Sequence, residues 1–208
     1  MLHPHTNKIF QELQQALKTK QRASFIVSGG SSPVSIFNEL SSCDLDWARI
    51  DIALVDERRV DTNHQDSNEK MVKNELLINK AAEANYISIS QDPERVAKIG
   101  KPFDIVLLGM GEDGHFASLF SEHIMQNPDD INNKSKPNII YTKPMGQPCH
   151  ERISMNLSMI LRSLKIYLLV SNQEKFMVLE KSITDSSFPV FYLLNQNKAG
   201  IEILGQDQ

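Results

Sequence analysis

Apolar residues along the chain follow two spacings, one typical of buried strands and one typical of amphipathic helices. Short runs of β-branched and large apolar residues predict strands at 23–27, 50–55, 86–89, 103–108, 139–142 and 166–170. Apolar residues at helical spacing predict helices at 9–17, 33–40, 67–77, 93–99 and 174–183. The segment 152–164 is mixed, and the pattern after Phe188 is ambiguous. This alternation predicts an α/β fold, a Rossmann-like open and mainly parallel sheet with helices on both faces.

Composition narrows the class of protein. The 208 residues contain neither a repeat nor a Pro/Ser-rich linker, so residues 1–208 are expected to form one domain. The net charge is −4, whereas proteins that bind nucleic acid usually carry an excess of positive charge, so nucleic acid is not expected as a partner. No apolar run approaches membrane-spanning length, and the first residues lack a signal-like apolar core. With two distant cysteines, Cys43 and Cys149, these features predict a cytoplasmic protein; they do not set its oligomeric state.

Four polar motifs follow directly after predicted strands. They occupy residues 28–32, 56–58, 109–115 and 171–175. In an open α/β sheet, ligands bind in the crevice beyond the carboxyl ends of the strands. We therefore expect the four motifs to line one pocket.

The third motif, Gly109-Met110-Gly111-Glu112-Asp113-Gly114-His115, has the composition of a catalytic loop. Its glycines permit backbone conformations that are closed to other residues. A helix beginning at 115–119 would place His115 near a positive helix end, where a neutral imidazole is favoured as a general base. The alternative interpretation is a glycine-rich turn that carries a surface histidine.

The first motif, Ser28-Gly29-Gly30-Ser31-Ser32, resembles an anion cradle. Its glycines would expose backbone N–H groups to a phosphate, its serines add donors, and the following helix directs its positive end toward the ligand. The motif lacks the Gly-Lys-Ser/Thr ending of a Walker A loop and the third glycine of a dinucleotide fingerprint, which weakens an oxidoreductase assignment. A plain strand-to-helix turn is the alternative.

The remaining charged candidates are Asp56, Arg58 and Lys175. Arg58 would grip a phosphate bidentately if an acidic neighbour oriented it, and Lys175 would add a second positive charge. Both are equally compatible with a solvated surface cluster. No group of His, Cys, Asp and Glu has a recognisable ligand spacing, so the sequence predicts neither a metal nor a cofactor.

Together these motifs resemble the 6-phosphogluconolactonases of the pentose phosphate pathway, in the larger group that contains glucosamine-6-phosphate isomerase. Four blocks carry the resemblance, at 28–33, 55–68, 109–120 and 148–154, and the third is the most specific. The resemblance implies hydrolysis of 6-phospho-D-glucono-1,5-lactone to 6-phosphogluconate. It assigns His115 as the base that activates water. The sequence leaves two roles open for the second catalytic candidate, Asp113, which would either orient His115 or cap the turn.

The predicted substrate-binding residues are those of the strand-end motifs and of the fourth block. They are Ser28, Gly29, Gly30, Ser31, Ser32, Asp56, Arg58, Gly111, Gly114, Arg152 and Lys175. The expected partner is a small sugar-phosphate lactone. A lactone is an activated ester, so a positioned water, a base and oxyanion donors suffice for its hydrolysis.

Two other functions remain open at this stage. A sugar-phosphate isomerase/deaminase of the wider group usually continues the loop toward Asn-Glu-Pro, whereas this chain continues with Ala117-Ser118-Leu119-Phe120. A non-catalytic sugar-phosphate sensor would be expected to carry a helix-turn-helix module. Only about 20 residues precede the first predicted strand, which is short for such a module.

Overall fold

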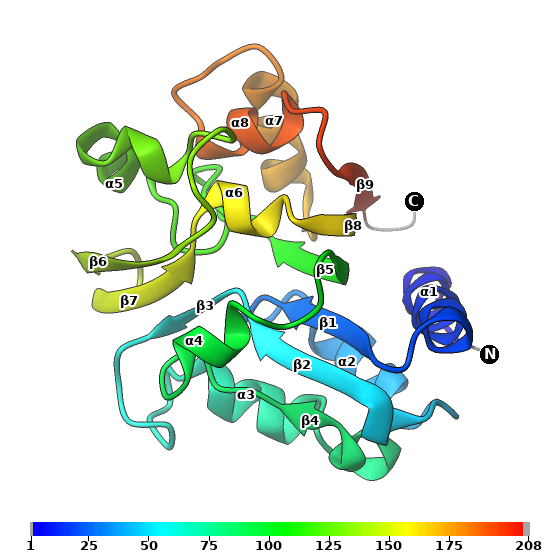
Figure 1. Ribbon diagram of the computed structural model, residues 1–208. Coiled ribbons are helices and arrows are strands. Elements are labelled where there is room, and N and C mark those ends of the chain that lie inside the picture. Colours follow the sequence, from blue (N-terminus) through cyan, green and yellow to red (C-terminus); the bar gives the residue numbers. More distant parts are fainter. Residues whose placement is uncertain (1, 206–208) are drawn as a thin grey trace.

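The computed structural model describes residues 2–205, and a six-stranded parallel sheet forms its centre (Figure 1). The strand order is β4-β2-β1-β5-β8-β9, and each neighbouring pair is parallel. The strands are β1 (Ala23–Val27), β2 (Ile50–Leu54), β4 (Asn85–Tyr86), β5 (Phe103–Gly109), β8 (Ser163–Val170) and β9 (Gly200–Gly205). The predicted parallel α/β architecture is confirmed.

The strand order places a topological switch point between β1 and β5. From β1 the chain winds outward through β2 to β4, and from β5 it winds the opposite way through β8 to β9. β1 and β5 themselves pair in parallel, with Val27 opposite Leu107. A crevice opens beyond the carboxyl ends of two such strands because their following connections leave in opposite directions. The loops at 28–32 and 109–115 border this crevice.

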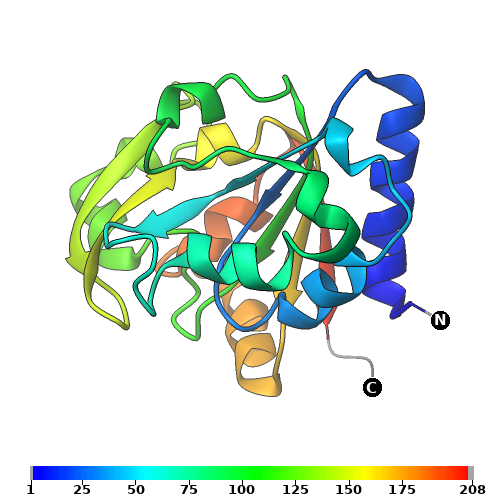
Figure 2. The same cartoon turned by 90° about the horizontal axis from the view of Figure 1, so that it is seen from below.

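Helices surround the parallel sheet (Figure 2). The α-helices are α1 (Pro4–Thr19), α2 (Val34–Ser41), α3 (Asn68–Glu75), α4 (Pro93–Val96), α5 (Ser121–Gln126), α6 (Leu157–Ile160), α7 (Gln173–Ser182) and α8 (Pro189–Leu194). Short 3₁₀ helices occupy Trp47–Arg49, Asn79–Glu83 and Pro128–Asp130. Within residues 2–205, no helix has the length and apolarity needed to cross a membrane.

The hydrophobic core lies along the central strands. Every residue of β1 is buried, as are the first six residues of β5 and the last five of β8. These strands are covered on both faces, which explains why their sequences are continuous apolar runs rather than alternating patterns. The rigid centre fixes the positions of the loops that leave β1, β5 and β8.

A second, antiparallel sheet lies beside the parallel one and was not predicted. Its order is β3-β7-β6, formed by Asp56–Arg58, His150–Met155 and Ile139–Met145. β6 and β7 project from one side of the molecule in Figure 1. The register places Arg58 opposite Arg152. The predicted strand at 139–142 is therefore present, but the mixed segment at 152–164 divides into β7, α6 and the start of β8.

The predicted helix at 115–119 is wrong. Phe116 forms isolated β-bridges with Met110 and Leu119, and Ala117 has a φ of 50°. The loop folds back on itself because the Gly111 N–H donates to the His115 carbonyl at 2.8 Å. The next helix, α5, begins only at Ser121, so His115 does not lie at a helix N-terminus.

Three smaller differences concern the edges of the sheet and the chain beyond 188. The strand predicted at 86–89 is reduced to the two-residue strand Asn85–Tyr86, which pairs with β2. The helix predicted at 93–99 ends at Val96. The ambiguous segment after Phe188 contains α8 and the edge strand β9.

Candidate active site

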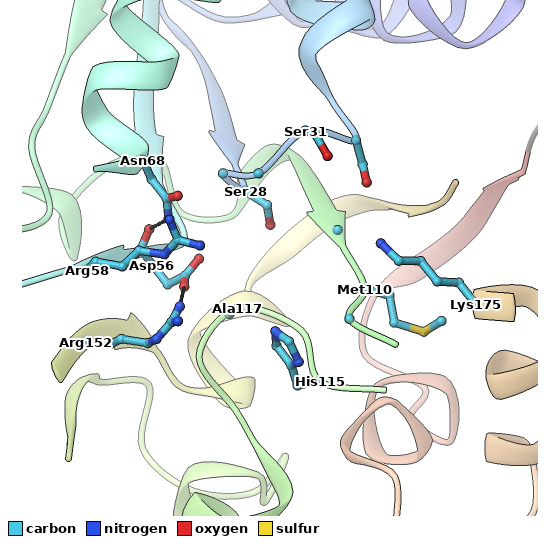
Figure 3. A pocket seen from close by; sticks show the side chains of 15 residues that line it. Ser28, Ser31, Asp56, Arg58, Asn68, Met110, His115, Ala117, Arg152 and Lys175 are labelled. Atoms are coloured by element: carbon cyan, nitrogen blue, oxygen red, sulfur yellow. Dashed lines mark hydrogen bonds and ion pairs between the residues drawn. The ribbon is translucent and has the colours of Figure 1, made fainter. Parts of the chain in front are cut away.

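A cavity of about 200 Å³ occupies the crevice at the switch point (Figure 3). It is lined by residues that follow β1 and β5, by residues of β3 and β7, and by residues from the starts of α3 and α7. Its lining residues are Ser28, Gly29, Gly30, Ser31, Ser32, Asp56, Arg58, Asn68, Gly109, Met110, Gly111, His115, Ala117, Arg152 and Lys175. The four polar motifs thus meet at one pocket, as the strand-end argument predicted.

The serine-glycine loop after β1 forms the wall of the cavity next to α2. Gly30 has a φ of 84°, a conformation that side chains rarely adopt. The Ser28 hydroxyl is buried, and within residues 2–205 it has no hydrogen-bond partner. The Ser32 hydroxyl donates to the Ser171 hydroxyl at 3.2 Å, which ties the loop to the end of β8. The glycines leave backbone N–H groups accessible, and the Ser28 hydroxyl lacks a partner. This wall is therefore suited to bind an anionic or polyhydroxy ligand.

Asn68 packs against this loop and explains the glycine at position 29. A Cβ atom at Gly29 would lie 2.0 Å from the Asn68 Oδ1 atom. Asn68 is fixed in turn because its Nδ2 atom donates to the Asp56 carbonyl at 3.0 Å. The sequence analysis did not select Asn68 as a site residue. Its place directly after the helix-capping Ser67 is the signal that points to it.

Glu57 holds the start of α3 in position. Its buried carboxylate accepts hydrogen bonds from the backbone N–H groups of Asn68 at 2.8 Å and Glu69 at 2.6 Å. The Ser67 hydroxyl donates to it at 3.0 Å. Burial raises the pKa of Glu57, although these donors oppose that effect. Glu57 does not line the cavity and acts as a helix cap that sets the position of Asn68.

Asp56, Arg58 and Arg152 form a charged cluster on one side of the cavity (Figure 3). The Asp56 Oδ2 atom accepts a hydrogen bond from the Ser118 hydroxyl at 2.7 Å and lies 4.0 Å from Arg152 Nη1. Burial lowers the pKa of Arg152, and Asp56 partly offsets that effect. Arg58 Nη1 donates to the Asp66 carbonyl at 2.7 Å, while its buried Nε has no partner within residues 2–205. Arg58 lines the cavity, and a guanidinium at a cavity wall is suited to bind an oxyanion.

His115 stands at the floor of the cavity and is paired with Asp113. The Asp113 carboxylate accepts hydrogen bonds from His115 Nδ1 and, at 3.2 Å, from the His115 backbone N–H. Burial tends to raise the pKa of Asp113, but the hydrogen bonds and the charge of His115, with the backbone hydrogen bonds of the turn, together lower it. The carboxylate therefore holds the ring in the tautomer that leaves Nε2 free to accept a proton. The orientation of the ring is therefore set by this pair, and no helix begins at His115.

Two further residues shape the surroundings of the imidazole. A Cβ atom at Gly111 would lie 2.2 Å from the His115 ring, so only glycine leaves space for the observed ring position. Phe120 stacks on the His115 ring with centroids 4.0 Å apart, and the Arg152 guanidinium lies 5.1 Å from the Phe120 centroid. Phe120 thus bridges the histidine and the charged cluster.

Lys175 lies across the cavity from the arginines (Figure 3). It occupies the first turn of α7, which Asn172 caps by accepting from the Lys175 backbone N–H at 2.8 Å. Among the described residues, no carboxylate lies within ion-pair distance of its ammonium group. An uncompensated cation beside the serine-glycine loop favours binding of a ligand phosphate.

Most of the predicted site residues line the cavity, and two do not. Asp113 lies behind His115, and Gly114, with a φ of 76°, packs against Phe188. Their positions favour supporting roles in the loop rather than contact with a ligand. Besides Asn68, the cavity is lined by Gly109, Met110 and Ala117, which were not selected as site residues because their side chains have no acid–base or charged group.

The chain matches the family model described as glucosamine-6-phosphate isomerases/6-phosphogluconolactonase over residues 1–201. It is 36% identical to a 6-phosphogluconolactonase of Helicobacter pylori, covering 95% of this chain and 90% of that protein. It is 38% identical to a 6-phosphogluconolactonase of Neisseria meningitidis, covering 88% and 84% of the two chains.

Solved structures agree with these relatives. A 6-phosphogluconolactonase from Shewanella baltica superimposes with a TM-score of 0.86 at 30% identity, covering 96% of this chain and 90% of that one. A putative 6-phosphogluconolactonase from Neisseria gonorrhoeae gives 0.85 at 34% identity, covering 96% and 92%. The chain belongs to the glucosamine-6-phosphate isomerase/6-phosphogluconolactonase family.

Proposed function

We propose that this protein hydrolyses 6-phospho-D-glucono-1,5-lactone to 6-phosphogluconate in the oxidative pentose phosphate pathway. The observation that carries the proposal is the His115–Asp113 pair, which faces a cavity with cationic groups on two sides. The relatives that match most of the chain are named 6-phosphogluconolactonases, which supports the same reaction. The wider family includes isomerases, but the segment at 117–120 does not follow their pattern.

The proposed reaction begins with a water held beside His115 Nε2. The imidazole takes a proton from this water as its oxygen attacks the lactone carbonyl, and Asp113 stabilises the imidazolium that forms. The tetrahedral intermediate then collapses, and the ring C–O bond breaks. The imidazolium returns its proton to the departing ring oxygen, so His115 ends the cycle neutral and the product is the open-chain acid.

Binding of the phosphate group orients the lactone, because a single base and a water need a well-positioned carbonyl. We place the phosphate at the serine-glycine loop and Lys175, with Arg58 and Arg152 available to the sugar hydroxyls or to the phosphate oxygens. Binding energy gained at a non-reacting group positions the carbonyl over His115. Asp56 is engaged by Ser118 and lies near Arg152, so we assign it to orientation of the cluster rather than to proton transfer.

A direct assay tests the proposal. Purified protein is mixed with freshly generated 6-phosphoglucono-δ-lactone, and the spontaneous hydrolysis rate is subtracted. We expect saturable turnover, and a parallel assay with glucosamine 6-phosphate is expected to show none. Binding of 6-phosphogluconate without turnover would identify a sensor instead, and release of ammonia from glucosamine 6-phosphate would identify a deaminase.

Gly111→Ala is expected to lower kcat by about a hundredfold, because displacing a catalytic group by about 1 Å has an effect of that size. The new methyl group would overlap the His115 ring, which is the side chain able to move. The melting temperature should change little. Gly200→Ala is the matched control, because a Cβ there meets only ordinary contact at 3.7 Å. Unchanged kcat in Gly111→Ala would contradict the proposed position of His115.

Asp113→Asn is expected to lower kcat by about tenfold, less than loss of the base itself, because Asp113 is half exposed and its charge is screened. The lowered pKa of Asp113 means that the pair stabilises the fold above the ordinary carboxyl pKa and is lost as pH falls through the lowered value. The variant should therefore lose part of this acid-range pH dependence of stability. Asp185→Asn, which alters a similar exposed carboxylate–backbone contact outside the cavity, is the control for kcat and should leave it unchanged.

Turnover is expected to be independent of metal ions. His115 and a water account for the proposed chemistry, and a lactone needs no Lewis acid to be hydrolysed. Dialysis against a chelator, followed by elemental analysis and assay, should leave kcat unchanged. Activity that disappears with a metal and returns when it is added back would require a different mechanism.

We further propose that residues 1–208 act as one domain in the cytoplasm. One hydrophobic cluster includes residues of both halves of the parallel sheet and of the antiparallel sheet, which supports a single folding unit. Cys43 and Cys149 are both free thiols, which suits a reducing compartment.

A further inference from the structure

Two histidines and one aspartate meet on the outer side of the loop between β3 and α3. His64 and Asp66 belong to this loop, and His150 begins β7, which pairs with β3. His150 Nε2 lies 2.9 Å from Asp66 Oδ2, and His64 Nδ1 lies 3.6 Å from the same oxygen. One ligand atom from each of the three residues lies within 4.8 Å of the others.

We propose that His64, Asp66 and His150 form a binding site for a divalent transition metal, with Zn²⁺ as the best match. Two imidazole nitrogens and one carboxylate oxygen are a common ligand set for this ion. Bonds of about 2.0–2.1 Å in a tetrahedral site place ligand atoms roughly 3.3–3.5 Å apart. The Asp66 oxygen lies 2.9 Å from the His150 nitrogen and 3.6 Å from the His64 nitrogen, one distance below this range and one above it. Small side-chain rotations therefore complete the site.

The surroundings permit entry of the ion and a fourth ligand. The side chains of His64, Asp66 and His150 are 42%, 23% and 24% exposed, so a water can complete the coordination. Binding replaces two hydrogen bonds, the one between His150 and the Asp66 carboxylate and the one that the Asp66 backbone N–H donates to His64 Nδ1 at 3.1 Å. A proton on His150 Nε2 moves to Nδ1 or is released, as metal ligation by a neutral imidazole requires.

The site lies outside the proposed catalytic cavity, but it is linked to a cavity residue by a hydrogen bond and by the chain itself. None of its three residues lines the substrate cavity. However, the Asp66 carbonyl accepts the hydrogen bond from Arg58, and Ser67 and Asn68 follow directly. An ion held by Asp66 and His150 would join the β3–α3 loop to β7 and stabilise the loop that supports Arg58. We therefore infer a structural site rather than a catalytic one.

Titration of the purified chain with Zn²⁺, in competition with a chromophoric chelator, tests this proposal without an activity assay. The parent is the His3→Gln/His5→Gln protein, because these two rings lie 4.8 Å apart and could bind stray metal. We expect one Zn²⁺ per chain and a melting temperature that rises with Zn²⁺. His64→Gln and His150→Gln should each weaken binding by at least about tenfold and abolish the rise. Because His64 is exposed, His64→Gln should fold normally. It therefore tests the site even if His150→Gln has a folding defect.

Two control variants separate this site from other metal-binding groups. Cys149→Ser removes the exposed thiol next to His150, and His115→Asn removes the pair with Asp113. Both should bind Zn²⁺ as the parent does. The proposal is overturned if either control abolishes binding, if the His64 and His150 variants retain parental affinity, or if the parent binds no Zn²⁺ at micromolar concentration.

Discussion

Replacing His115 by alanine is expected to lower kcat for 6-phosphoglucono-δ-lactone by about 10²–10⁴-fold, the usual contribution of a general acid–base group. The affinity for the product 6-phosphogluconate should change little, because the proposed task of His115 is proton transfer. Stopped assays for turnover and calorimetric titration with product measure the two effects separately.

Two other variants sharpen this experiment. His115→Asn keeps a polar side chain of similar size and should be nearly as inactive as alanine, because the amide cannot accept the proton. His5→Asn removes a histidine of α1 outside the cavity and should keep full turnover. A His115 variant with near-normal kcat would remove this residue from the mechanism. A product affinity that falls as far as kcat would instead indicate a binding role.

The position of the site was predictable because it depends on the direction of the strands. Polar motifs after β1 and β5 must share one edge once both strands are parallel, and the switch point brings them to one crevice. No side-chain detail is needed for that inference. It was sufficient to place the 28–32 loop, His115 and Lys175 around one cavity.

The environment of His115 was not predictable in the same way. A helix at 115–119 was expected from composition, but Gly111 and Gly114 let the loop fold back, and Ala117 takes a positive φ. Ser118 then becomes buried and donates to Asp56, a contact between residues 62 positions apart. Tertiary contacts of this kind override local helix propensity. The tautomer and orientation of the imidazole therefore depend on Asp113 rather than on a helix end.

Long-range pairing also explains what the sequence analysis missed. The antiparallel sheet brings Arg152 beside Arg58, although 152–164 has no clear period. The same pairing brings His150 to Asp66, 84 residues away, so the proposed metal site has no ligand spacing that a motif search could detect. Asn68 is held at the cavity by Glu57, which fixes the start of α3, and by the Asp56 carbonyl.

Lys175→Ala is expected to lower kcat/KM for the phosphorylated lactone by about 10- to 100-fold, the effect of losing one hydrogen bond to a charged group. Unphosphorylated glucono-δ-lactone should be hydrolysed at nearly the same kcat/KM by the variant and the unaltered protein. The difference isolates phosphate recognition, because Lys175 has no ion-pair partner among the described residues whose loss would disturb the fold. Lys181→Ala, in the last turn of the same helix, is the matched control and should affect neither substrate.

Arg58→Ala should give a mixed result that distinguishes the two cations. Its guanidinium lines the cavity but also donates to the Asp66 carbonyl at 2.7 Å. We therefore expect a loss for both lactones, with the larger loss for the phosphorylated one. If Lys175→Ala reduces kcat/KM equally for both substrates, the lysine supports the loop rather than the phosphate. The anion would then have to bind on the opposite side of the cavity, between Arg58 and Arg152, because those are the remaining cations that line it.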